Sequence, residues 1–342
     1  MLAAFCDRPG AFALREVPRP EMQSGQVIVR VRSCGICGSD LHVFSGDLPP
    51  APVCPGHEIS GEVVDVAPDV RGVCAGERVA VEPLVTCRRC AYCQTGDYQL
   101  CARFKLLGMM VDGGFAEYVR IPAYAAFRLP AAVDFEVGAL AEPLAVGVHA
   151  LRLARMRLGD RVLVLGAGTI GLLCVAAAQA AGASDIWITA RHPHQQDAAR
   201  LLGATHIFGG WDGDAGLSAA SSECPPDIVI ETVGGQASTI DQALSLVRPA
   251  GTVAVLGVFT GMATVNPMLL MAREIRLIGS NTYGRSGPRA DFDVALDMLA
   301  GDPERFRRLI THRVPLTGIT AGFETAADKR SHSIKVAVRP AD

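Results

Sequence analysis

A glycine turn between an apolar strand and an apolar helix constrains the fold of this chain more than any other feature. VLVL over 162–165 is followed by GAGTIG over 166–171 and by LLCVAAAQAA over 172–181. The first glycine permits a tight turn, the second lets backbone approach a pyrophosphate, and the third lets helix and strand pack closely. Free N–H groups at the helix start favour the phosphates. The alternative is a turn without a ligand. We expect these nucleotide contacts: Gly166, Gly168, Thr169, Ile170 and Gly171.

The chain beyond residue 151 repeats an apolar strand, a glycine turn and a helix. Further buried strands are expected at 185–190, 204–209, 226–235, 251–258 and 275–281. This alternation predicts a doubly wound α/β sheet, so residues 151–285 are expected to form a Rossmann domain that binds a dinucleotide.

The first 150 residues have a different character. Apolar and polar residues alternate in short segments bounded by Gly or Pro, at 25–35, 60–70 and 76–85. We expect a partly open, GroES-like β-barrel there. After the Rossmann domain, 289–310 is expected to be helical and 331–340 to form a closing strand. The tail, 286–342, is therefore expected to return to the first domain.

Composition excludes several classes of function. Apolar residues make up 49% of the chain and charged residues 20%, with a net charge of −3. That profile indicates a globular protein and argues against nucleic-acid or membrane-surface binding. The uncharged stretch 162–181 has the length of a membrane span, but its three glycines fit a buried strand–turn–helix better. The start shows no secretory signal, and we expect a cytoplasmic protein.

The end of the second Rossmann strand indicates which dinucleotide is bound. An NAD site carries Asp or Glu about 20 residues beyond the glycine turn, on the ribose 2′-hydroxyl. Nineteen residues past Gly171 the chain has Ala190, followed by Arg191. A small residue and a guanidinium accommodate a 2′-phosphate, so we expect NADP(H), with His192 as a second contact. The alternative is that Arg191 lies in a solvated loop.

Four cysteines follow one another at short spacings in CRRCAYCQTGDYQLC. Such spacing lets one loop wrap a tetrahedral ion, and four thiolates close the site to water. A structural zinc is expected, and an iron–sulfur cluster or surface thiols are the alternatives. The expected ligands are Cys87, Cys90, Cys93 and Cys101.

A second set of metal-type ligands is spread over the first 150 residues. SCGICGSDLH contains Cys34, Cys37, Ser39 and His42, and could by itself be a redox dithiol or half of a zinc site. His57 and Glu58 stand in GHE, and Glu142 stands in AEPL. Cys37, His57 and one carboxylate would give an open zinc site with a position left for water or substrate.

With these motifs in view, the chain resembles a zinc-dependent medium-chain alcohol dehydrogenase over essentially its whole length. The resemblance rests on CGICGSDLH, GHE, the four-cysteine segment, EPLAVGVHA and GAGTIG. It is closest to the polyol (sorbitol-like) and threonine dehydrogenase branch, where EP carries a glutamate in place of a zinc-ligating cysteine. Quinone reductases of the superfamily lack the zinc ligands and fit poorly.

The resemblance implies a role for each residue of the open site. Cys37 and His57 would bind the catalytic zinc, with Glu58 or Glu142 as the third ligand. Cys34 matches no ligand. Ser39 would hydrogen-bond the substrate oxygen, His42 would pass the proton to solvent, and Asp40 would support His57. His149, Phe44 and Tyr283 are expected to serve packing rather than the site.

The expected function is hydride transfer between NADP(H) and a secondary alcohol, polyol or amino alcohol, or the matching ketone. Two alternatives remain: the same chemistry with NAD(H), and a catalytically silent zinc- and nucleotide-binding redox sensor. The expected cofactors are one catalytic zinc, one structural zinc and NADP(H). The expected partners are a small-molecule substrate and, from the resemblance, further copies of the chain in a homodimer or homotetramer.

Overall fold

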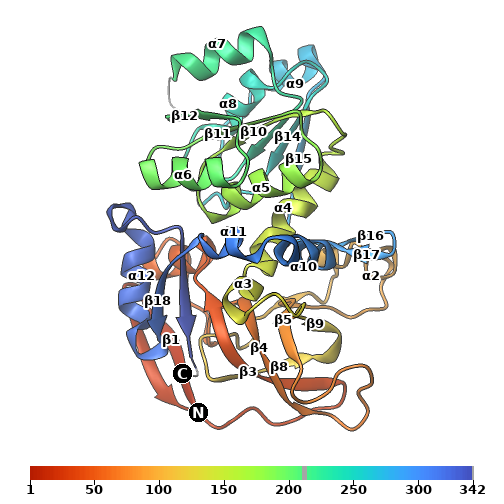
Figure 1. The fold of residues 1–342 in the computed structure, drawn as a ribbon, viewed down its shortest axis with the longest axis vertical. Coiled ribbons are helices and arrows are strands. Elements are labelled where there is room, and N and C mark those ends of the chain that lie inside the picture. Colours follow the sequence, from red (N-terminus) through yellow and green to blue (C-terminus); the bar gives the residue numbers. More distant parts are fainter. Residues whose placement is uncertain (210–213, 341–342) are drawn as a thin grey trace. The chain divides into compact units, whose positions relative to one another are not determined.

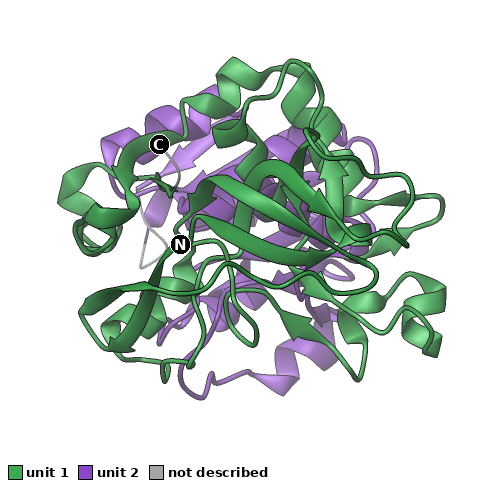
Figure 2. Ribbon diagram, turned by 90° about the horizontal axis from the view of Figure 1, so that it is seen from below, with its two compact units in different colours: residues 1–142, 284–342 green, residues 143–283 purple. Residues whose placement is uncertain are grey.

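The computed structural model describes residues 1–209 and 214–340, and they divide into two compact units. The first unit comprises Met1–Glu142 and Gly284–Asp342, and the second comprises Pro143–Tyr283 (Figure 2). The chain therefore leaves the first unit once, at Glu142, and returns to it at Gly284.

The described part of the second unit is built on a parallel sheet of six strands (Figure 1). Their spatial order is β12-β11-β10-β13-β14-β15, so the order reverses between β10 and β13. In such sheets the ligand crevice lies at the carboxyl ends of the strands, at this reversal. The strands are β10 (Arg161–Leu165), β11 (Asp185–Thr189), β12 (His206–Phe208), β13 (Ile228–Glu231), β14 (Thr252–Val255) and β15 (Arg276–Gly279).

Helices cover both faces of this sheet, which confirms the doubly wound prediction. Helices α5 and α6 pack together on one face, and α8 packs with α7 and α9 on the other (Figure 1). The second unit's helices are α5 (Thr169–Ala180), α6 (Pro193–Leu201), α7 (Ala215–Glu223), α8 (Thr239–Leu246) and α9 (Pro267–Arg273), while α4 (Ala141–Leu153) spans the boundary between the units.

The strand and helix on either side of the glycine turn are buried, as their apolar sequences predict. Residues 162–165 are inaccessible to solvent, and most of α5 is buried on all sides. Strands covered on both faces read as continuous apolar runs, and a helix apolar all round lies in a core. Helix α5 is 12 residues long. No helix in the described part of the chain is long and apolar enough to span a membrane.

The first unit contains a mixed sheet whose ends do not meet. Its order is β18-β19-β3-β4-β5-β9, with β8 also paired to β3, so the barrel is partly open. The last strand of the chain runs antiparallel to β3 and pairs Val338 with Cys34. The strands of this sheet are β3 (Gln26–Gly35), β4 (Glu58–Val66), β5 (Arg78–Val81), β8 (Tyr118–Pro122), β9 (Ala126–Arg128), β18 (Ile310–Pro315) and β19 (Lys335–Arg339).

Shorter elements surround that sheet. The remaining strands are β1 (Leu2–Arg8), β2 (Ala11–Glu16), β6 (Leu84–Val85), β7 (Lys105–Leu106), β16 (Arg285–Ser286) and β17 (Arg289–Ala290). The helices are α1 (Gly38–Ser45), α2 (Ala91–Thr95), α3 (Phe135–Ala139), α10 (Asp291–Gly301), α11 (Pro303–Arg307) and α12 (Ile319–Ala327). Single 3-10 turns lie at η1 (Tyr98–Leu100), η2 (Ala123–Ala125), η3 (Leu316–Gly318) and η4 (Lys329–Ser331).

Four phenylalanines from distant parts of the sequence fix the core beside α1. The ring of Phe323 on α12 lies 4.5 Å from Phe12, 5.2 Å from Phe44 and 5.7 Å from Phe115, measured between centroids. Such pairs stabilise a core beyond the area that they bury. Phe44 therefore packs in this core, and the returning segment helps to hold α1 in place.

A buried carboxyl joins the four-cysteine segment to the returning chain. Glu82 is 2% exposed and accepts a hydrogen bond from the hydroxyl of Tyr98. The same hydroxyl lies 3.3 Å from the carbonyl oxygen of Gly284. Nearby, the N–H of Arg285 donates to the carbonyl of Gly96 at 2.9 Å. Burial raises the pKa of Glu82 to about 7, although the bond from Tyr98 opposes the shift.

This pKa predicts a pH-dependent component of stability. Because the pKa of Glu82 rises from 4.5 to about 7 on folding, the folded state holds a proton that the unfolded state has lost in that range. Stability should therefore fall as pH rises from 4.5 to 7. Urea unfolding should show wild type losing about 3 kcal/mol more than Glu82→Gln across this window. Parallel pH profiles for the two proteins would contradict the prediction.

Candidate metal centres and nucleotide site

The start of helix α1 places Cys37 and Asp40 at the centre of the first candidate site. Cys37 is the N-cap residue, and the Asp40 carboxylate accepts a hydrogen bond from the Cys37 backbone N–H at 3.1 Å. A helix N-terminus favours negative charge, so this position suits a ligand that carries one. Ser39 and His42 follow on the same helix three positions apart, which puts them on one face.

His57 lies at the entrance to β4, directly beside this helix start. Its ring is 4% exposed, and Nδ1 lies 3.7 Å from Asp40 Oδ1, beyond hydrogen-bond distance. The ring is also hydrogen-bonded to the Cys37 side chain. Nδ1 has no hydrogen-bond partner, which leaves Nε2 for the Cys37 contact. The structure thus brings Cys37 and His57 together and sets Asp40 behind the ring.

The two candidate carboxylates have different surroundings. Glu58 is 1% exposed, and both of its oxygens accept hydrogen bonds of 2.6 Å from Nζ of Lys335. Lys335, on the last strand, also donates to the carbonyl of Ile36 at 2.8 Å. Burial alone would lower the pKa of Lys335, but the charges of Glu58, Cys37 and Glu142 raise it. The negative charge of Glu58 is therefore compensated by the positive charge of Lys335 within the protein.

Glu142 comes to the same place from the start of α4, far along the sequence. It is 5% exposed, and its charge acts on both His57 and Lys335. Cys37, His57 and a glutamate supply sulfur, nitrogen and oxygen donors, the set found in open zinc sites. These residues fit a zinc ion by their chemistry. Their donor atoms are less tightly grouped than those of the four cysteines.

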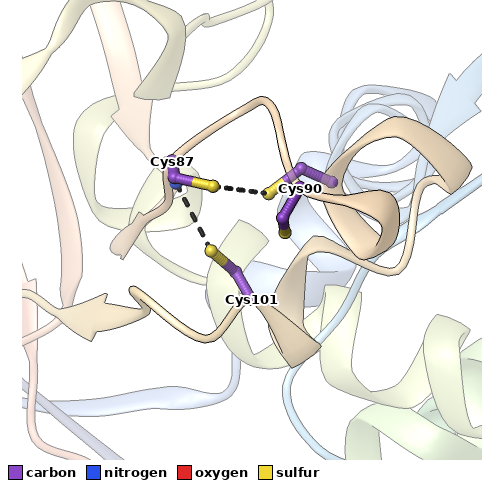
Figure 3. A group of neighbouring side chains, drawn as sticks. Cys87, Cys90 and Cys101 are labelled. Carbon is purple, nitrogen blue, oxygen red and sulfur yellow. Dashed lines mark hydrogen bonds between the residues drawn. The ribbon is translucent and has the colours of Figure 1, made fainter.

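The four-cysteine segment forms a compact sulfur cluster (Figure 3). In the described part of the chain, these four cysteines are the metal-ligand type residues whose donor atoms all lie within 4.8 Å of one another. Backbone N–H groups of Cys87 and Arg103 donate to Cys101 Sγ at 3.4 Å. Hydrogen bonds from Arg89 and Cys90 backbone lower the pKa of Cys87 to about 6. Four sulfurs so placed, with backbone donors, fit a closed structural zinc.

The glycine turn after β10 has the geometry of a phosphate-binding loop. Gly166 has φ +100°, and a Cβ on Gly171 would lie 1.9 Å from the Gly166 carbonyl oxygen, so both positions require glycine. A Cβ on Gly168 would meet no atom within 4 Å. The protein itself therefore has no need of glycine at 168, and the open space suits an approaching ligand. Thr169 and Ile170 begin α5 directly after Gly168, its N-cap residue.

The end of β11 is tied to this turn and lacks a carboxylate. Thr189 Oγ1 accepts a hydrogen bond from the Gly166 N–H at 2.8 Å. Ala190 is 1% exposed, and Arg191 is exposed at the start of the following loop. His192 is the N-cap of α6 and stacks on His194, with ring centroids 5.6 Å apart.

Two polar residues of the site were not predicted from the sequence. Lys335 is 277 residues from its partner Glu58, so no local pattern could reveal the pair. Asp47 follows α1, and its Oδ2 lies 3.0 Å from His42 Nδ1. Its position five residues after His42 was the available signal. Cys34, by contrast, is fully buried, and burial raises its pKa well above the ordinary value, so no dithiol chemistry is indicated.

Comparison with known proteins agrees with this architecture. The family described as "Alcohol dehydrogenase GroES-like domain" matches residues 23–131, and "Zinc-binding dehydrogenase" matches 169–301. Sorbitol dehydrogenase of Bacillus subtilis is 32% identical, over 99% of this chain and 97% of the relative.

Two solved structures share the fold over nearly the whole chain. A putative zinc-binding dehydrogenase from Sinorhizobium meliloti, bound to NADP, has a TM-score of 0.88 and 32% identity, with 99% of both chains covered. The 2R,3R-butanediol dehydrogenase from Bacillus subtilis has a TM-score of 0.86 and 30% identity at the same coverage. The chain belongs to the zinc-dependent medium-chain dehydrogenase family, and it is an oxidoreductase.

Proposed function

We propose that this protein transfers a hydride between NADP(H) and a secondary alcohol, polyol or amino alcohol, or the matching ketone. The observation that carries the proposal is the face of α1 that bears Ser39 and His42, directly after Cys37 and beside His57. A protein that only bound zinc and nucleotide would have no use for a hydroxyl and an imidazole at that point. Relatives named as sorbitol and butanediol dehydrogenases support the proposed hydride transfer.

The side chains of α1 provide a path for one proton. When bound, zinc makes the alcohol oxygen more acidic and the nicotinamide takes up the two electrons of the oxidation. Ser39 Oγ accepts the proton of the substrate hydroxyl and passes its own toward His42 on the next turn. His42 Nδ1 lies 3.0 Å from the exposed carboxylate of Asp47, which leads to solvent. The hydrogen bond from His42 lowers the pKa of Asp47 and keeps it ionised.

Charge balance selects the third zinc ligand. With Cys37 as thiolate and Glu142 as carboxylate, a zinc ion is neutralised by two ligands, while Glu58 and Lys335 neutralise each other. If Glu58 moved to the metal, Lys335 would stay buried without its partner, which is strongly unfavourable. We therefore assign Cys37, His57 and Glu142 to the catalytic zinc. The four cysteines would hold a second, structural zinc.

Metal analysis tests this assignment. Wild type should retain two zinc ions per chain after dialysis, and Glu142→Gln should retain one, because a neutral amide is a much poorer ligand. The matched control is Glu58→Gln combined with Lys335→Met, which removes both charges of the buried pair and should retain two. Zinc loss in the control but not in Glu142→Gln would assign the ligand to Glu58.

The choice of NADP(H) rests on Ala190 and Arg191. A buried alanine directly follows β11, where a carboxylate would repel a 2′-phosphate, and the next residue is an exposed arginine. A guanidinium offers paired donors to a phosphate. The Sinorhizobium meliloti relative, solved with NADP, supports the same preference.

Nicotinamide fluorescence titration tests the cofactor. NADPH should bind at least about tenfold more tightly than NADH, and Arg191→Ser should remove most of that preference, through loss of a charge-assisted hydrogen bond. Arg200→Ser, on the following helix and paired with Asp197, should leave both affinities unchanged. Tighter binding of NADH by wild type would contradict the proposal.

Replacement of Ser39 separates an enzyme from a redox sensor. Ser39→Ala should lower kcat about a hundredfold, because it removes one step of proton transfer. The variant should still bind NADPH with wild-type affinity. Ser222→Ala, an exposed position on α7, serves as control. Unchanged turnover in Ser39→Ala would exclude the proton path described here.

We also propose a homodimer or homotetramer in the cytoplasm. One of the two outermost strands of the parallel sheet, β15, has no partner on its outer side among the described residues, and Met262, Met268 and Met271 are exposed at 102%, 61% and 67%. Exposed edges and apolar patches are normally covered by a partner. The eleven free cysteines favour a reducing compartment. A monomer in light scattering would contradict the oligomer.

A further inference from the structure

A pocket in the first unit opens beside Ser39. It contains about 530 Å³ of empty space, part of it open to solvent. Its floor is formed by Ser39 and Asp40 on α1, and the segments 49–55 and 108–109 supply much of its wall. The side chains that set its character are apolar: Phe12, Val43, Pro49, Ala51, Val53 and Met109.

The polar side chains of the pocket are buried, apart from Ser39: Asp40 is 5% and Cys6 4% exposed. Asp40 Oδ2 accepts the bond from the Cys37 N–H at 3.1 Å, and Oδ1 faces His57 at 3.7 Å. Cys6 Sγ donates to the Arg8 carbonyl at 3.5 Å, and burial raises its pKa, so it stays a thiol. Among the described side chains around the pocket, the Ser39 hydroxyl is the group left to hydrogen-bond a ligand. The side chains of the pocket therefore offer a hydrogen bond to one oxygen of the substrate, from Ser39.

A polyol entering this pocket would have to give up water around several hydroxyls. A hydroxyl moved from water to an apolar site without a new hydrogen bond costs free energy, whereas a methylene group gains it. Four more hydroxyls on a five-carbon chain would meet Val43, Val53, Met109 and the prolines rather than hydrogen-bonding side chains. An alkyl chain of the same length would meet the surface that it prefers.

From this pocket, and resting on the proposed function, we infer that the substrate is a secondary alcohol with an apolar alkyl substituent, or the matching ketone. A polyol hydroxylated at every carbon is the disfavoured class. Met109 is the residue that the inference singles out as specificity-determining. It lines the pocket, while its neighbour Met110 does not and is 55% exposed. The two methionines form a matched pair for substitution.

Two acyclic five-carbon alcohols, 2-pentanol and xylitol, test the inference. The assay uses zinc-replete full-length protein and follows alcohol + NADP⁺ → ketone + NADPH + H⁺ by absorbance. The kcat/KM for 2-pentanol should exceed that for xylitol by about a hundredfold, since xylitol leaves several hydroxyls unpaired. Equal values, or a preference for xylitol, would overturn the inference and leave the oxidoreductase intact. Turnover of neither alcohol would overturn the proposed function as well.

The matched variants then assign the effect to the pocket wall. Met109→Gln keeps the length of the side chain and adds an amide, so it should lower the 2-pentanol to xylitol ratio about tenfold. Met110→Gln should leave the ratio unchanged. Zinc content and NADPH affinity, measured on each variant, show that it is folded. A ratio that Met109→Gln leaves unchanged, in folded protein, would overturn the role of Met109.

Discussion

A buried ion pair between the last strand, β19, and the start of β4 holds the candidate site together. Lys335 on β19 donates to both oxygens of Glu58, the residue that follows His57. Neither side chain is more than 3% exposed. A lysine so deeply buried is stable only with its partner in place. Strand β19 must therefore pair with β3 before the surroundings of His57 are complete.

This pair also explains local sequence that would otherwise look arbitrary. A Cβ at position 35 would lie 1.9 Å from Glu58 Oε2, so the residue beside the carboxylate has to be glycine. The Ile36 carbonyl, which accepts from Lys335, directly precedes the N-cap Cys37. The chain around Cys37 is thus shaped by the ion pair. Because Lys335 holds Glu58, we propose Glu142 rather than Glu58 as the metal ligand.

Motifs that lie within a few residues of one another could be predicted from the sequence. Contacts between residues far apart in the sequence could not. The glycine turn and the four cysteines lie within a few residues, so their spacing carries the geometry. The strand expected over 226–235 ends at Glu231, because Gly234 and Gly235 adopt positive φ. The helix expected over 289–310 breaks at Asp302-Pro303, since proline cannot continue a helix from the preceding turn.

For the open site, the sequence predicted which residues take part but not how they are arranged in space. Cys37, His57 and Glu142 come from three segments, and their proximity depends on how these segments pack within the first unit. The partner of Glu58 lies at the other end of the chain, so the choice between Glu58 and Glu142 could not be made from sequence. The apolar pocket beside Ser39 is likewise formed by side chains of β1, β2, α1 and two loops.

Equilibrium unfolding of Lys335→Met, alone and together with Glu58→Gln, tests the central claim most directly. The single variant leaves a carboxylate buried without a partner and should lose about 3 kcal/mol of the free energy of unfolding. The double variant removes both charges and should recover most of that loss. If the single and double variants are equally stable, the ion pair does not hold the site, and the assignment of Glu142 to the metal loses its physical basis.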